Sequence, residues 1–203
     1  MGVRVAMSPR RVVVFGGTFD PVHNGHIAIT KCLRDESDAD SVIMVPTGRP
    51  WLRPDAPVAT PEDRLRMVEL AVEDESGIEV SDVDIVRDKT TYSIDTINDL
   101  RPRYGTDCEF ILAIGTDAVP DLHRWHRYEE LIEECTFVVV ERPGAPLDDT
   151  TSLPKNAFVI RGPMINISAS EIRSKIEQGD LANAADVLPD LVLRFIIEKG
   201  LYQ

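Results

Sequence analysis

Three features are scarce or missing in this 203-residue sequence: cysteine, long apolar runs and basic charge. The three cysteines, Cys32, Cys108 and Cys135, are far apart, which argues against a disulfide framework and against a cysteine-built metal site. They indicate a reducing compartment. Since no apolar run approaches the length of a membrane span, we expect a cytoplasmic protein without a membrane partner. Residues 1–11 lack an apolar core, so no signal peptide is expected, whether the chain starts at Met1 or Met7.

Basic residues are outnumbered, with 22 Lys and Arg against 35 Asp and Glu, which leaves a net charge of -13. A surface this acidic repels nucleic acid, so no nucleic-acid partner is expected. A pocket on an acidic protein can still be locally positive, so a small anionic ligand stays compatible with this charge. Hydrophobic residues make up 43% of the chain, which is ordinary for a globular protein, and the length fits a single domain over residues 1–203.

Short apolar runs alternate with segments of helical periodicity along the chain. The runs that predict buried strands are 12–15, 41–46, 110–114, 136–140 and 158–160. Helices are expected over 25–34, from Pro61 onward after Thr60, over 93–100 with Ser93 as N-cap, and over 128–132. A last helical region is expected to begin at a capping box formed by Ser168 and Glu171 and to continue to residue 200, with breaks at Gly179 and Pro189. This alternation predicts a doubly wound α/β fold, with a mostly parallel sheet, helices on both faces and a C-terminal helical part.

Two segments are less regular than the rest. Residues 78–86 alternate apolar and polar side chains with a break at Asp82, which predicts a half-exposed strand pair or a bulged strand. Residues 47–60 are rich in proline and long for a plain connection, which predicts a functional or mobile loop.

The first expected strand runs directly into a glycine-rich turn, Gly16-Gly17-Thr18-Phe19-Asp20-Pro21, which is followed by His23 and His26. Glycines at the carboxyl end of a parallel strand let the backbone approach a phosphate, and the following helix N-terminus adds N–H donors. A histidine there can donate to a phosphate oxygen as negative charge develops. The chain has no G-x-x-x-x-G-K-[ST] run and does not complete G-x-G-x-x-G, which argues against a P-loop and against nicotinamide-dependent hydride transfer.

All four histidines fall into pairs with a spacing of three, His23 with His26 and His123 with His126. No cysteine or suitably spaced carboxylate completes a ligand set, so no protein-built metal site is predicted. His23 and His26 lie beside the glycine-rich turn, where binding a phosphate explains them better than binding a metal ion does.

Two separated motifs give the chain a recognisable resemblance. The segment from Gly16 to His26, which ends in His-Asn-Gly-His, resembles the signature of the nucleotidyltransferase superfamily with the H-x-G-H motif. Near the other end, residues 167–173 resemble that superfamily's I-S-S-T-x-x-R motif, with Ala169 in place of the usual second serine. The resemblance covers nearly the whole chain and implies a Rossmann-like nucleotidyltransferase fold.

Within that superfamily the sequence looks like a bacterial nicotinate-nucleotide adenylyltransferase. Residues 91–96 resemble the family's S-Y-T-x-D-T stretch, and residues 110–117 resemble its strand that ends in G-x-D. Trp125 lies where the family has a tryptophan-bearing turn, and Arg-Pro-Gly at 142–144 follows the next strand as it does in the family.

One departure from the family pattern concerns the acceptor side. The family often has P-P-H-K where this chain has Pro-Trp-Leu-Arg at 50–53. Arg53 keeps a cation in place of the lysine, while the bulky Trp51 changes the shape of the acceptor pocket. We predict that this loop closes as a lid and that Arg53 then reaches a phosphate. The alternative is a surface loop whose Trp51 packs on its own domain.

The resemblance implies transfer of AMP from ATP to nicotinate mononucleotide, with Mg²⁺ held mainly by phosphates and water. Trp125 would stack on the nicotinate ring, while Ser93 and the backbone N–H of His126 would hold its carboxylate. The implied residues are His23, His26 and Arg173 for catalysis; Gly16, Gly17, Thr18, Phe19, His23, His26, Gly115, Asp117, Ile167, Ser168, Ser170 and Arg173 for ATP; and Ser93, Trp125, His126, Trp51 and Arg53 for the acceptor.

Two alternative functions stay open. One is an adenylyltransferase for another phosphorylated acceptor, such as pantetheine phosphate, against which Trp125 and residues 91–96 argue. The other is a non-catalytic nucleotide-binding module, against which the intact His23, His26 and Arg173 argue. A carboxylate suits Ser93 and a helix N-terminus better than a neutral amide does, yet the preference between nicotinate and nicotinamide nucleotides stays open. Homo-oligomer formation also stays open.

Overall fold

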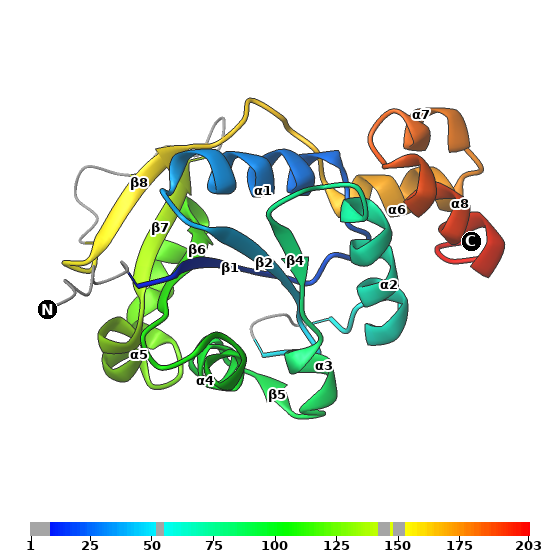
Figure 1. The fold of residues 1–203 in the computed structure, drawn as a ribbon. Coiled ribbons are helices and arrows are strands. Elements are labelled where there is room, and N and C mark those ends of the chain that lie inside the picture. The colour runs from blue at the N-terminus through cyan, green and yellow to red at the C-terminus, as the bar shows by residue number, and fades with distance from the viewer. Residues whose placement is uncertain (1–8, 52–54, 142–146, 148–152) are drawn as a thin grey trace, which may run out of the picture.

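Six strands form one parallel sheet in the order β4-β2-β1-β6-β7-β8 (Figure 1). The computed structural model describes residues 9–51, 55–141, 147 and 153–203, so Met1, Met7, Arg53 and the segment 142–144 lie outside the described residues. The strands are β1 Arg11–Gly17, β2 Ser41–Pro46, β4 Ile78–Val80, β6 Glu109–Gly115, β7 Thr136–Glu141 and β8 Ala157–Arg161. The prediction of a parallel α/β sheet is confirmed.

These strands are unbroken apolar runs because helices cover both faces of the sheet. In β1, Val13 and Phe15 belong to one buried cluster, while Val12 and Val14 belong to the other. Helices from both ends of the chain cover the first cluster, and helices from its middle cover the second, on the opposite face (Figure 1). The first set is α1 Asn24–Glu36, α2 Pro61–Val72, α6 Ala169–Glu177, α7 Leu181–Ala185 and α8 Asp190–Lys199; the second is α4 Ser93–Tyr104, the 3-10 helix η1 Thr116–Arg124 and α5 Tyr128–Glu134.

The connections diverge between β1 and β6, the two central strands. From β1 the chain runs outward through β2 and β4, and it later returns to β6 and runs outward through β7 and β8 on the other side. Ligands of open parallel sheets bind beyond the carboxyl ends of the strands at such a point. Gly17 ends β1 and Gly115 ends β6, so both predicted glycine-bearing turns lie there.

The observed helix starts lie close to the predicted positions, but two of the three predicted side-chain caps do not form. Thr60 caps α2 as predicted, with its hydroxyl accepting from the N–H of Asp63 at 3.1 Å. Ser168 is the N-cap residue of α6, but its side chain makes no capping bond, so the predicted capping box does not form. Ser93 is also not a cap: Tyr92 occupies that position and Ser93 is the first helical residue. Because Tyr92 has the extended backbone of an N-cap, α4 begins one residue earlier than the prediction with Ser93 as N-cap.

The segment 78–86 is not the strand pair or bulged strand that its alternation predicted. The strand β4 ends at Val80, and a short helix, α3 Val83–Val86, follows. The reason lies in Asp84, whose buried carboxylate accepts from the Thr96 hydroxyl at 2.7 Å and from Arg87 Nη2 at 2.9 Å. The helical turn puts Asp84 and Arg87 on one face, which a strand cannot do.

The segment 47–60 contains regular structure that was not predicted. Its strand β3, Arg49–Pro50, pairs in parallel with β5, Thr90–Thr91, as a separate two-stranded sheet. The pairing lies between segments about forty residues apart in sequence, and it brings the proline-rich segment next to the start of α4.

The C-terminal helices return to the carboxyl edge of the sheet. The breaks at Gly179 and Pro189 separate α6, α7 and α8 as predicted. Beyond α8, Tyr202 donates its hydroxyl to Asp20 Oδ1 at 2.8 Å, which ties the end of the chain to the turn after β1. Over the described residues, no helix combines the length and apolar character that crossing a membrane requires.

Candidate active site

The glycine-rich turn after β1 is shaped by one aromatic side chain. Phe19 adopts a positive φ of 51° and folds its ring back over the turn. A Cβ atom at Gly17 would lie 2.7 Å from that ring, so a larger residue would require the buried Phe19 ring to move. Gly16, Gly17, Thr18 and Phe19 line a cavity of about 470 Å³ at the carboxyl edge of the sheet.

The two histidines cap the start of α1 for each other. The N–H of His26 donates to His23 Nδ1, and the N–H of His23 donates to His26 Nδ1, both at 3.3 Å. Their rings stack with centroids 3.7 Å apart. A Cβ atom at Gly25 would lie 3.0 Å from His23 Nδ1, which explains the glycine between them. Because each Nδ1 accepts a hydrogen bond, the proton of each neutral ring lies on Nε2, and both rings can donate from that atom.

The second motif lines the same cavity, as the sequence predicted. Ile167, Ser168, Ser170 and Arg173 face residues 16–26 across it, and Asp117 completes the rim. Arg173 Nη1 donates to the backbone oxygen of Asp20 at 2.7 Å, and Nη2 donates to Ser170 Oγ at 3.3 Å. The N-terminus of α6, the cation of Arg173 and the donors of the histidines make the cavity suitable for an anion despite the acidic chain.

Asp20 is a buried centre of hydrogen bonding that the sequence analysis did not assign to the site. Only 3% of the residue is exposed, and its carboxylate accepts from the N–H groups of Val58 and Ala59 at 2.8 and 3.0 Å and from the Tyr202 hydroxyl. Burial, followed by the charge of Asp20, raises the pKa of Tyr202, so that phenol stays protonated and donates. The carboxylate thus joins the turn after β1, the end of the 47–60 segment and the C-terminus.

Arg64 on α2 is a second buried group that sequence reasoning missed. It is 0% exposed, and it donates to the backbone oxygens of Thr18 at 2.7 Å and Gly48 at 3.2 Å. It therefore links the glycine-rich turn to the start of the 47–60 segment. A charged residue within an otherwise apolar helix face was the available signal, because a buried cation requires such partners.

A second cavity, of about 350 Å³, adjoins the first. Gly16, Gly17, Thr18 and Asp117 line both cavities, so the two meet at the end of β1. Three of the predicted acceptor residues, Ser93, Trp125 and Trp51, line the second cavity. Gly115, predicted for ATP, and His126, predicted for the acceptor, line neither cavity. Gly115 ends β6 next to the site, and the His126 ring stacks on Tyr92 with ring centroids 4.2 Å apart.

Trp51 both contacts its own domain and lines the second cavity, while the closure of its loop as a lid stays a prediction. It is 37% exposed and its ring lies 5.6 Å from that of Tyr92, so it packs on its own domain. It also forms part of the wall of the second cavity. Tyr92, between Trp51 and His126, was not singled out from the sequence, although it belongs to the 91–96 stretch that carried the resemblance.

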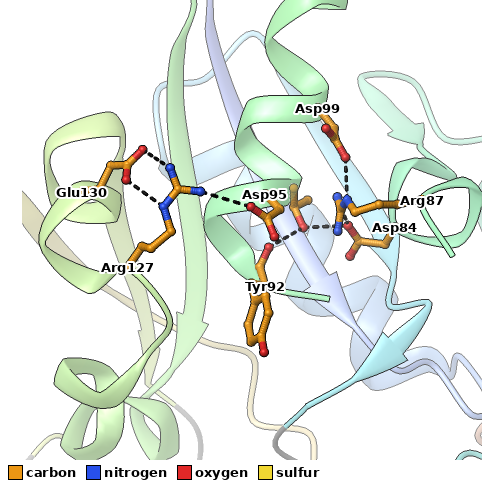
Figure 2. A network of polar contacts seen from close by, with 8 residues as sticks. Asp84, Arg87, Tyr92, Asp95, Asp99, Arg127 and Glu130 are labelled. Carbon is orange, nitrogen blue, oxygen red and sulfur yellow. Dashed lines mark hydrogen bonds and ion pairs between the residues drawn. The ribbon is translucent and has the colours of Figure 1, made fainter. Parts of the chain in front are cut away.

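Two arginines from outside α4 bind acidic side chains of this helix (Figure 2). On one side, Arg87, the residue that follows α3, binds Asp84 and donates from Nε to Asp99 Oδ2, in the middle of α4, at 2.6 Å. On the other side, Arg127 donates to Asp95 Oδ1 at 3.3 Å. Asp84 lines the second cavity, and its burial raises the pKa of its carboxyl against the opposing pull of Thr96 and Arg87.

Comparison with known proteins points to one kind of protein. A profile of the family described as cytidylyltransferase-like matches residues 14–175. A "probable nicotinate-nucleotide adenylyltransferase" of Salinispora arenicola is 36% identical over 93% of this chain and 99% of its own length. A protein of the same description from Frankia alni is 40% identical over 93% and 98%.

Solved structures agree in fold. The nicotinic acid mononucleotide adenylyltransferase of Plasmodium falciparum, complexed with NaAD, superposes with a TM-score of 0.76 at 21% identity. The aligned region covers 95% of this chain and 97% of that one. A second structure of that protein, complexed with APC, gives a TM-score of 0.73 at 20% identity. At such identities the likeness establishes the Rossmann-like fold.

Proposed function

Because the chain belongs to the nicotinate-nucleotide adenylyltransferases of the cytidylyltransferase-like family, we propose that it transfers AMP from ATP to nicotinate mononucleotide. The products are nicotinate adenine dinucleotide and pyrophosphate. The observation that carries this proposal is the junction of the two cavities at Gly16, Gly17, Thr18 and Asp117. A nucleotide in each cavity would bring two phosphates together where the glycine-rich backbone lies, which is the arrangement that the transfer needs.

The chemistry needs positioning and charge stabilisation more than a protein nucleophile. An oxygen of the acceptor phosphate attacks the α-phosphorus of ATP in line, and the bond from that phosphorus to the bridging oxygen breaks as its electrons pass to pyrophosphate. We assign His23 to the α-phosphate and His26 to the triphosphate, each donating from Nε2. Ser168, Ser170 and Arg173 would bind the β- and γ-phosphates at the N-terminus of α6, as the cavity lining supports.

The remaining ATP contacts follow from the same cavity. Thr18 and the backbone of Gly16, Gly17 and Phe19 would hold phosphates, while Ile167 would border the nucleotide. Asp117, with Gly115 two residues before it, would contact the adenosine or its ribose. We treat residues 1–203 as one nucleotidyltransferase domain, since the two motifs that build this cavity come from opposite ends of the sequence.

Mg²⁺ would arrive with ATP and offset the charge of the triphosphate. The side chains that line the cavity are mainly donors. Of its carboxylates, Asp20 already accepts from the N–H groups of Val58 and Ala59, and Asp117 lies at the rim. Such a set fits a metal ion that is held by phosphate oxygens and water, with the protein binding the phosphates.

The acceptor would occupy the second cavity. Trp125 would stack on the nicotinate ring, and Ser93 with the N–H of His126 would hold the carboxylate near the N-terminus of α4. Trp51 would form the outer wall, and Arg53 would reach a phosphate. We place the reaction in the cytoplasm and leave the number of subunits open.

The test is pyrophosphate release from ATP and Mg²⁺ with four acceptor conditions: nicotinate mononucleotide, nicotinamide mononucleotide, pantetheine phosphate and no acceptor. We expect the highest kcat/KM with the nicotinate nucleotide. Equal kcat/KM for the two pyridine nucleotides would contradict the assigned carboxylate contacts. Faster release with pantetheine phosphate, or none with any acceptor, would overturn the proposed function itself.

A further inference from the structure

The turn after Trp125 ends in a residue whose side chain reaches back to α4. Arg127 has a left-handed backbone with φ 55°, an uncommon conformation for a residue other than glycine. Its guanidinium lies between two carboxylates, donating from Nη1 to Asp95 on α4 and from Nε and Nη2 to Glu130 on α5 (Figure 2). The turn that carries Trp125 and His126 therefore presents a cation to the first turn of α4.

Asp95 occupies a position where its charge opposes anion binding. Tyr92 is the N-cap of α4, and its carbonyl accepts from the N–H groups of Asp95 and Thr96, so the amides of Ser93 and Ile94 precede the first of these bonds. An acidic side chain in the first turn offsets the positive end of the helix dipole. Left uncompensated, Asp95 would repel a carboxylate bound at these amides.

We propose that Arg127 is a specificity-determining residue that favours a carboxylate-bearing acceptor by neutralising Asp95. The inference rests on the proposed function, which puts the nicotinate carboxylate near Ser93. Without Arg127, the carboxylate of Asp95 would keep an uncompensated negative charge in the first turn of α4, where these amides lie. A neutral carboxamide would be largely indifferent to this charge, so the change would appear as a lower ratio of acid to amide use.

A purely mechanical role for Arg127 makes a different prediction. Its bond to Asp95 also ties the Trp125 turn to α4, as does the stacking of His126 on Tyr92. A loosened turn would weaken ring stacking for the acid and the amide alike, because both acceptors carry the same pyridine ring. A turn displaced far enough to move the N–H of His126 would also lower the use of the acid. Asp95→Asn identifies that case, because it removes the same bond to Arg127 without leaving an uncompensated negative charge on α4.

The experiment measures kcat/KM for nicotinate and nicotinamide mononucleotides in the wild type, Arg127→Gln, Asp95→Asn and the double variant. Where amide turnover is too slow to follow, the amide's inhibition constant against the acid gives the same comparison. We expect Arg127→Gln to lower the acid-to-amide ratio about fivefold, through KM, since a partly exposed charge near a helix terminus has an effect of this order. Asp95→Asn should keep or raise the ratio, and the double variant should return it toward the wild-type value.

Arg124→Gln is the matched control. Arg124 forms a similar surface pair, with Asp121 at 3.0 Å, on the preceding helix η1, and its loss should leave the ratio unchanged. An equal loss for both acceptors in Arg127→Gln, or an equal drop in the ratio in Asp95→Asn, would show a mechanical clamp and overturn the inference. If the wild type uses the acid and Arg127→Gln has the same acid-to-amide ratio as the wild type, the inference is rejected while the proposed function stands. A wild type inactive with both pyridine nucleotides rejects the proposed function as well.

Discussion

On the first cavity's side, the glycine-rich turn is held by Asp20 and Arg64, which are 3% and 0% exposed. On the second cavity's side, the Trp125 turn is held by Arg127 and Asp95, whose side chains are 42% and 32% exposed. Buried charged groups are costly to leave without a partner, whereas partly exposed pairs contribute little and are screened by salt. We therefore expect the glycine-rich turn to be intolerant of substitution at its supporting residues, while the Trp125 turn depends on weaker contacts that can be tuned.

The largest expected effect is on catalysis at the ATP side. His23→Ala should lower kcat about 10² to 10³-fold, because one donor to the developing charge is lost. His23 also caps α1, so His23→Asn, which keeps a polar side chain at the cap, separates turnover from stability. Steady-state kinetics and thermal melting are compared with exposed His123→Ala, which should behave as wild type. A folded His23→Ala enzyme with near-normal kcat would remove the histidine from the mechanism.

The next effect is on stability, at the buried centre of the same side. Asp20→Asn replaces an acceptor oxygen by an NH₂ group that faces N–H donors of Val58 or Ala59, so we expect a loss of about 3 kcal/mol in the free energy of unfolding. Urea denaturation measures it. Asp38→Asn is the matched control, since Asp38 pairs with Arg11 at the surface and should contribute under about 1 kcal/mol. Similar losses in both variants would show that Asp20 stabilises the fold no more than a surface pair does.

A smaller effect is expected at the acceptor side. Trp125→Leu keeps apolar bulk but removes the stacking surface, and we expect the acceptor's KM to rise about fivefold. The KM for ATP, measured with the same enzyme, should stay unchanged and serves as the internal reference. If the KM for ATP rises equally, Trp125 acts in core packing that supports both cavities.

The smallest expected effect is a pH dependence at Asp84. Its pKa is raised above the ordinary 3.8 by burial, so the folded protein holds this proton to a higher pH than the unfolded chain does. The contribution of Asp84 is therefore most favourable at low pH and is lost as pH rises through the raised pKa. Relative to Asp84→Asn, the wild type should lose stability as pH increases above 3.8 in urea titrations. A relative gain instead would show that Arg87 dominates the carboxylate.

The sequence predicted the parts of the site that local patterns encode. The turn at Gly16 and Gly17, the histidine pair and the α6 segment with Arg173 all line the first cavity, while Ser93, Trp125 and Trp51 line the second. It missed the groups that support them. Asp20 meets Tyr202 across 182 positions, and Arg64 meets Thr18 across 46, so neither contact leaves a periodic trace in the sequence.

By itself, the sequence determined the alternation of strands and helices, because a strand that is buried on both faces must be apolar throughout. It also determined the two motifs, because a tight turn that faces a phosphate requires glycine. Only the tertiary structure decided that 78–86 ends in a helix, that 47–60 pairs with the segment before α4, and that Arg127 faces Asp95. These features depend on which polar groups meet after the chain has folded. A buried or paired charge is stabilised by partners distant in sequence, and their meeting is settled by packing rather than by local propensity.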